Sequence, residues 1–227
     1  MDLVHDASLG GANSSADIRE AWLKLLAFGD RVEIIAGRQA LNWGTGDLVF
    51  ANDLFAKDWN AFLIGREDPY LKVPADAFRL TLHRLPLGVD SVYMPRFTAD
   101  VLPDAARLAV RLPAKEGVTV APPDVPGGMF ADGEVGLRLS RRVGPGTFAL
   151  YAYQGYTKTP EAARIEGATL TPFHTELRAA GASLRGAMLG GVYWLESAFR
   201  GTPGNSKGND PMLPGPRADA IVGYQRP

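Results

Sequence analysis

The chain has 227 residues, of which 46% are hydrophobic and 22% are charged, which is enough for one large folded domain. Its 24 basic and 25 acidic residues give a net charge of −1, so it lacks the basic excess of a nucleic-acid-binding surface. Because of this charge balance we expect no nucleic-acid partner. Cysteine is absent, which excludes a disulfide framework and thiolate metal sites.

No stretch of the sequence approaches the roughly 20 consecutive apolar residues that a membrane-spanning helix needs. A membrane is not excluded by this, because a transmembrane strand needs only about 9–11 residues and half of them face a polar lumen. The residues after Met1 lack the basic and apolar regions of a secretion signal. Either the protein is not exported or its beginning is missing.

Short segments of alternating apolar and polar residues, separated by Gly and Pro, predict an all-β protein. The clearest segment is 78–83, in which Phe and Leu fall on one face and Arg, Thr and His on the other. A helix over 17–27 is the alternative for the second segment. In chain order we expect about ten strands, near 2–8, 17–27, 31–39, 76–84, 89–95, 133–142, 147–156, 173–185, 191–200 and 218–225.

Tight and long connections alternate along the chain. The tight ones are near 28–30, 85–88, 143–146 and 186–190, and the long ones near 40–75, 96–132, 157–171 and 201–217. Outer-membrane barrels have short turns at one end and long loops at the other. We therefore predict a single domain over 1–227, an antiparallel up-and-down transmembrane β-barrel.

Four groups of residues carry a resemblance to a known family. They are Gly37-Arg38-Gln39 with Trp43-Gly44, the segment from Asp68 to Pro74, Tyr93-Met94-Pro95-Arg96-Phe97 with Leu102-Pro103, and Gly181 to Gly186 followed by Gly190 to Glu196. Together they resemble a family of largely uncharacterised bacterial outer-membrane β-barrel proteins, related in style to alginate-export-type porins. The resemblance implies a porin-like protein in the outer membrane of a Gram-negative bacterium.

The chain departs from that family at both ends. Family members begin with a cleaved secretion signal, and outer-membrane barrels usually finish in a strand with a terminal aromatic residue, whereas this sequence stops at Gln225-Arg226-Pro227. We expect it to be an internal fragment of a barrel with further strands, because open sheet edges are costly in lipid.

Charged residues within the predicted strands are expected to face the lumen, because a lipid-facing Arg costs about 2–4 kcal/mol at the membrane midplane. The predicted pore-lining residues are Glu20, Lys24, Arg79, His83, Arg138, Arg178, Arg185 and Glu196. In the alternative interpretation these charges pair with one another and fill the lumen with salt bridges.

The connection over 42–72 is too long for a simple turn, and such loops are usually functional or disordered. Our hypothesis is that it folds into the barrel and narrows the pore. The predicted constriction residues are Asp47, Asp53, Asp58, Arg66, Glu67, Asp68 and Lys72. The alternative for its aromatic residues is packing against the barrel rim.

The sequence therefore favours a channel for passive diffusion of small polar or charged solutes, with the lipid bilayer as its surroundings. A homo-oligomer or a lipoprotein partner stays open. We predict no enzyme activity, cofactor or metal site, because the three histidines lack zinc-site spacing and no Gly-x-Ser-x-Gly motif occurs. Two alternatives are a soluble or secreted all-β module that binds a ligand or carbohydrate, and a barrel that sheathes a lipoprotein or electron-carrier partner.

Overall fold

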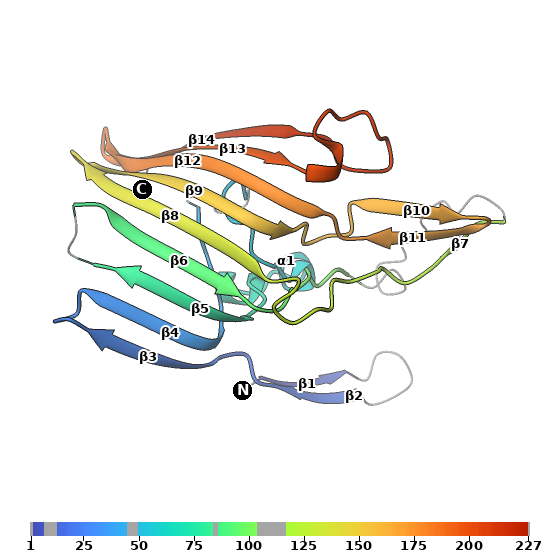
Figure 1. Cartoon of the computed structure of the whole chain (residues 1–227). Coiled ribbons are helices and arrows are strands. Elements are labelled where there is room, and N and C mark those ends of the chain that lie inside the picture. Colours follow the sequence, from blue (N-terminus) through green and yellow to red (C-terminus); the bar gives the residue numbers. More distant parts are fainter. Residues whose placement is uncertain (1, 7–12, 45–49, 84–85, 104–116, 227) are drawn as a thin grey trace.

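A nine-stranded antiparallel sheet dominates the computed structural model, which describes residues 2–6, 13–44, 50–83, 86–103 and 117–226 (Figure 1). The strand order is β14-β13-β12-β9-β8-β6-β5-β4-β3. The strands are β3 (Ala21–Ala27), β4 (Val32–Gln39), β5 (Ala75–Leu82), β6 (Gly88–Met94), β8 (Glu134–Val143), β9 (Gly146–Tyr156), β12 (Glu176–Met188), β13 (Gly191–Gly201) and β14 (Arg217–Gln225). The predicted all-β class is confirmed.

Smaller elements lie in the connections. β1 (Asp2–Asp6) pairs with β2 (Asn13–Asp17), and β10 (Ala162–Glu166) pairs with β11 (Thr169–Phe173), which also contacts β7 (Thr119–Val120). The helices are α1 (Trp59–Leu63), α2 (Asp68–Leu71) and the short 3₁₀ helix η1 (Pro203–Asn205). Residues 157–171, expected as a plain connection, thus contain a hairpin, and 21–27 form a strand rather than the alternative helix.

Short and long connections occur at opposite ends of the sheet, as predicted. The short ones are 28–31, 83–87, 144–145 and 189–190, and the long ones are 40–74, 95–133, 157–175 and 202–216. Positive φ angles shape the tight turns: Leu189 and Gly190 have φ of 53° and 77°, as a type I′ turn requires. Gly144 has φ of 55° before Pro145, which fits the type II′ turn.

One face of the sheet, here called the outer face, is apolar and exposed. The strand register places Leu25, Ile34, Leu80, Leu137, Ala152, Ala180, Phe199 and Ala218 in one row across it, interrupted only by Ser91. Leu23 is 81% exposed and Val222 is 78% exposed. Within the nine strands, the charged residues of this face all lie toward the strand ends: Arg38, Asp76, Arg141, Glu176 and Arg178.

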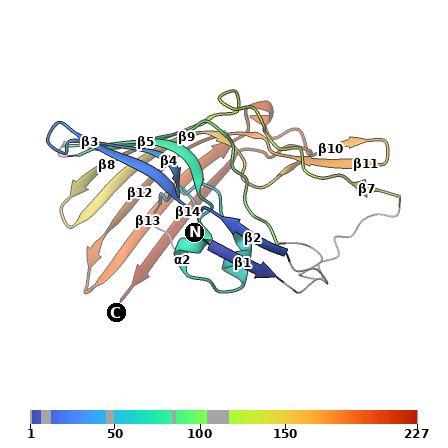
Figure 2. The same ribbon diagram turned by 90° about the horizontal axis from the view of Figure 1, so that it is seen from below.

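The opposite face, here called the inner face, is covered over part of its area by the connection between β4 and β5. Figure 2 shows the sheet bending from β3 round to β14, with α2 in the hollow. The buried core joins Leu41, Trp43 and Phe55 of this connection to the inner-face residues Ala77, Val92, Met94, Ala149, Tyr151, Tyr153 and Leu177. The core therefore lies between the sheet and its own connection.

No helix among the described residues is both long enough and apolar enough to cross a membrane.

Candidate functional site

The connection over residues 40–74, here called the inner segment, is anchored to the sheet by Trp43. Its Nε1 donates a hydrogen bond to Asp90 Oδ2 at 3.3 Å, and its ring packs against Phe55 and Tyr151 with centroid distances of 5.0 and 6.2 Å. A Cβ atom on Gly136 of β8 would lie 2.7 Å from the Trp43 ring. The glycine is thus required for the ring to rest on the strand backbone.

A second anchor joins the inner segment to β12 and β13. Asn52 Nδ2 donates a hydrogen bond to Glu196 Oε2 at 3.0 Å, and a Cβ atom on Gly181 would overlap the Asn52 side chain. Arg200 donates hydrogen bonds to the carbonyl oxygens of Phe50 and Ala51, the latter at 2.8 Å. The inner face therefore binds both the side chain of Asn52 and the backbone of the inner segment.

Two lysines and one aspartate form a buried ionic cluster inside this segment. Asp53 Oδ2 pairs with Lys57 Nζ at 3.3 Å and with Lys72 Nζ, and the Lys57 and Asp53 side chains are 4% and 3% exposed. Lys57 Nζ also donates to the carbonyl oxygen of Phe55 at 2.6 Å. The cluster fixes the shape of the segment because a buried charge is costly unless it is paired and hydrogen-bonded.

Burial lowers the pKa of Lys57 from 10.5 to about 8, and repulsion from Lys72 adds to the effect, while Asp53 partly offsets it. Between about pH 8 and 10.5 the unfolded chain keeps a proton on this amine that the folded chain releases, so the contribution of Lys57 to folding stability rises with pH in that window. We expect the unaltered chain to gain stability relative to Lys57→Met from pH 8 to 10.5, measured by urea unfolding in detergent micelles. Parallel stability curves for the two proteins would contradict the assignment.

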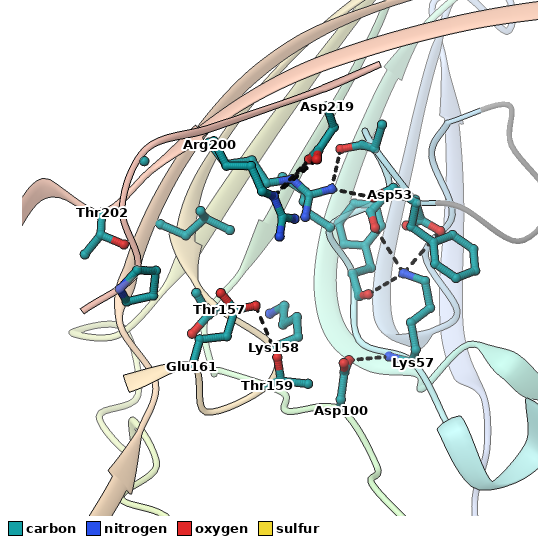
Figure 3. A pocket seen from close by; sticks show the side chains of 18 of the residues that line it. Asp53, Lys57, Asp100, Thr157, Lys158, Thr159, Glu161, Arg200, Thr202 and Asp219 are labelled. Carbon is teal, nitrogen blue, oxygen red and sulfur yellow. Dashed lines mark hydrogen bonds and ion pairs between the residues drawn. The ribbon is translucent and has the colours of Figure 1, made fainter. Parts of the chain in front are cut away.

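A cavity of about 600 Å³ lies between the inner segment, strands β13 and β14, and the connection after β9. Figure 3 shows Arg200 and Asp219 on the side of β13 and β14, with Lys158 and Glu161 facing them. Lys57 and Asp100 complete the wall on the side of the inner segment. The cavity is therefore lined by charges of both signs from segments far apart in the sequence.

Lys158 is held at the cavity wall by the fully buried Glu134. Its Nζ pairs with Glu134 Oε2 at 2.5 Å, and Glu134 Oε1 accepts hydrogen bonds from Tyr153 Oη at 2.7 Å and from the backbone N–H of Tyr156 at 3.0 Å. Burial lowers the pKa of Lys158, and the Glu134 carboxylate opposes that shift. The positive charge of Lys158 is therefore largely balanced by one carboxylate beneath it.

The inner face collects most of the predicted pore-lining residues. Lys24, Arg79, Arg138, Arg185 and Glu196 lie on it by strand register. Glu20 precedes β3, where its Oε1 accepts a hydrogen bond from Ala40 N at 2.9 Å, and His83 is exposed just after β5.

Arg178 lies on the outer face instead of the predicted lumen. It is exposed and pairs in register with Gln154 and Gly201. The reason is its neighbour Leu177, which packs into the core beneath the inner segment, so that alternation along β12 turns Arg178 outward. Its place near the end of β12 toward the long connections keeps it away from the middle of the apolar face.

Several inner-face charges are paired within the sheet. Arg79 meets Asp90 at 2.6 Å, Lys24 meets Glu33 at 3.0 Å, and both pairs join neighbouring strands. Salt bridges thus occupy part of this face, as in the alternative interpretation of the sequence.

Of the predicted constriction residues that the structure describes, Asp53 and Lys72 are the two that form an ion pair with each other. Asp58 caps α1 by accepting a hydrogen bond from Ala61 N at 3.0 Å, and Arg66 lies over the Tyr70 ring at 3.9 Å. Glu67 and Asp68 are exposed at the start of α2, and Asp47 lies outside the described residues.

The aromatic residues of the inner segment divide into two groups. Trp43 and Phe55 are buried against the inner face, whereas Phe50, Trp59 and Phe62 form an edge-to-face row with centroid distances of 6.2 and 5.9 Å. Each of these rings therefore has an aromatic packing partner, and Phe50, Phe55 and Trp59 also line the cavity.

Seven charged cavity residues were not singled out as site residues from the sequence: Lys57, Asp100, Lys158, Glu161, Arg200, Arg217 and Asp219. Arg200 ends a predicted strand and Asp219 begins another, so alternation would have placed them on the polar face. Lys57 and Lys158 lie in connections, where no periodic signal exists.

No group of three or more His, Cys, Asp and Glu side chains that could hold a metal ion is found in the described part of the chain. Comparison with protein-family models, with curated proteins and with solved structures finds no match to this chain. The resemblance drawn from the sequence motifs stays a prediction.

Proposed function

We propose that this chain forms part of a porin-like channel in a bacterial outer membrane, through which small polar or charged solutes diffuse passively. The observation that carries the proposal is the outer face, whose central rows across nine strands contain no charged residue. A lipid-facing surface of a barrel is expected to be apolar in its middle, with charges tolerated near the interfaces. The charged inner face then corresponds to the lumen.

The strand lengths and connections support the same proposal. Strands β8, β9, β12, β13 and β14 contain 10, 11, 13, 11 and 9 residues, which is enough to cross a hydrocarbon core when tilted. In the proposed barrel the edges of β3 and β14 pair with other strands, because unpaired backbone groups are costly in lipid. The short turns would then face the periplasm and the long connections the exterior.

A soluble binding module fits the two faces less well. Such a module would pack the apolar side of its sheet against a second layer, and here the covered side is the inner face, where the inner segment lies. The outer face instead leaves large side chains such as Leu23, Phe78 and Val222 exposed to more than half of their area. Exposed apolar surface on this scale indicates a membrane or protein interface.

The inner segment gives the proposed channel its restriction. It is fixed to the inner face by Trp43, Asn52 and Arg200, so solute can pass only through the space that it leaves free. The cavity of about 600 Å³ beside β13 and β14 is part of that space.

The proposal is tested by extraction and by conductance. We expect the protein to require detergent for extraction, to migrate differently on gels before and after boiling, and to produce stepwise conductance in planar bilayers. Heat-denatured protein is the control for the bilayer measurement. A β-rich protein that stays soluble without detergent and adds no conductance would contradict the channel proposal and favour a soluble binding module.

A further inference from the structure

We propose that the cavity beside β13 and β14 binds a small carboxylate that carries an apolar group. The inference deepens the proposed function, because such an anion would be a solute held on its way past the inner segment. It is carried by the arrangement of cations on the cavity wall, and binding can be measured whether or not the protein conducts.

Two arginines on this wall share one carboxylate. Arg200 on β13 and Arg217 on β14 are directly opposite in the strand register. Among the residues that the structure describes, Asp219 is the one carboxylate that pairs with them, with its Oδ2 3.5 Å from Arg200 Nε and its Oδ1 3.2 Å from Arg217 Nε. Like charges directly opposite in a sheet destabilise it, so a second carboxylate between the two guanidinium groups would relieve repulsion.

The Arg217 guanidinium is the group that can reach a ligand. Its side chain is 56% exposed, whereas that of Arg200 is 19% exposed and its NH2 group is used on the carbonyl oxygens of the inner segment. A guanidinium binds a carboxylate through two parallel hydrogen bonds, which distinguishes it from the lysines nearby. Arg217 is therefore assigned the direct contact and Arg200 the supporting charge.

The carboxylates of the inner wall are already engaged, which disfavours a cationic ligand. Asp53 is shared by two lysines, and Asp100 accepts hydrogen bonds from the backbone N–H of Lys57 at 2.7 Å and from Trp59 Nε1 at 2.8 Å. Glu161 is exposed and accepts a hydrogen bond from Thr159 Oγ1 at 3.3 Å. An anion thus meets two guanidinium groups that share one carboxylate, whereas a cation meets Asp53 and Asp100, of whose oxygens only the buried Asp53 Oδ1 accepts no hydrogen bond.

The apolar side chains that line the cavity explain the apolar part of the ligand. Phe50, Phe55 and Trp59 come from the inner segment, and Leu177 and Ile221 from strands β12 and β14. The volume of the cavity, about 600 Å³, lies within the range of about 300–1,000 Å³ that is typical of small-molecule sites. A benzoate-sized ligand could place its carboxylate at Arg217 and its ring against these side chains.

The test compares benzoate with benzamide, which has the same shape without the charge. Binding to the purified full chain in detergent micelles is measured by titration calorimetry and by tryptophan fluorescence. We expect saturable binding of benzoate with an affinity about tenfold or more above that of benzamide, as expected for a charge-assisted hydrogen bond. Equal binding of the two compounds, or none, would overturn the inference.

Three variants locate the site. Arg217→Gln should weaken benzoate binding about tenfold or more, whereas Asp219→Asn should strengthen it, because it removes the carboxylate that competes for the guanidinium groups. Arg142→Gln is the matched control, since Arg142 is an exposed inner-face arginine of β8 outside both the cavity and the predicted pore lining. Opposite signs for the first two variants cannot arise from general loss of folding. A loss with Arg142→Gln equal to that with Arg217→Gln, or no change in either cavity variant, would contradict the site.

The same titration separates this inference from the proposed function. Benzoate binding with the expected variant pattern in a protein that adds no conductance would leave the site standing and remove the channel. Conductance without any preference for benzoate over benzamide would support the channel and contradict the carboxylate site.

Discussion

Replacing Trp43 with alanine is expected to cost about 3–5 kcal/mol of folding stability and to release the inner segment from the sheet. The indole is 6% exposed, packs edge-on against Phe55 at 5.0 Å and donates a hydrogen bond to Asp90. Because Gly136 offers no side chain of its own, alanine at position 43 leaves a cavity that the neighbouring strand cannot fill. Unfolding by urea in detergent micelles measures the loss.

Release of the inner segment should also be visible in two local measurements. Limited proteolysis should cut the chain between 50 and 66 faster in Trp43→Ala than in the unaltered protein, and single-channel conductance in planar bilayers should increase. The control is Trp22→Ala, because Trp22 lies on edge strand β3 and is 47% exposed. A loss of stability without faster cleavage or higher conductance would show that Trp43 stabilises the sheet but does not hold the inner segment in place. It would also show that the inner segment does not restrict the pore.

The nine strands of the sheet could be predicted from the sequence because each is specified by a local signal. Alternation along 78–83 separates Phe78 and Leu80 from Arg79 and Thr81, and each short turn contains or adjoins a Gly. The short turns then predict four hairpins, β3-β4, β5-β6, β8-β9 and β12-β13, whereas the order of these hairpins across the long connections is given by the structure. Local periodicity and turn chemistry are therefore sufficient for the strands and the hairpins.

The position of the inner segment follows from contacts that no local pattern reveals. Trp43 needs the missing side chain of Gly136, and Asn52 needs that of Gly181, in strands far along the chain. From the sequence alone, a glycine in a strand indicates a weakened strand or a bulge. The structure shows that the missing side chains of these two glycines leave the space that Trp43 and Asn52 occupy.

Arg178 illustrates the limit of an energetic argument made without register. The cost of a lipid-facing arginine favoured the lumen, but that cost is small near the interfaces, and the buried Leu177 fixes the direction of the whole strand. Packing of one core residue therefore decides the orientation of its charged neighbour. The same reasoning explains why Lys57 and Lys158 were missed, since their partners Asp53 and Glu134 become evident only when the core is assembled.

Introducing a charge in the middle of the outer face is expected to separate a lipid-facing sheet from a water-exposed one. Ala180 on β12 is exposed and lies between Ala152 and Phe199 in the central apolar row, so Ala180→Arg should lower the stability of the protein in lipid vesicles by about 2–4 kcal/mol. The matched control is Met188→Arg, at the end of the same strand and on the same face, where Met188 pairs with Gly191 and the cost should be about 0–1 kcal/mol. Urea unfolding in vesicles measures both. If the outer face were exposed to water, Ala180→Arg should change the stability by no more than about 0.5 kcal/mol. Equal and small effects at the two positions would therefore mean that water, rather than hydrocarbon, surrounds this face.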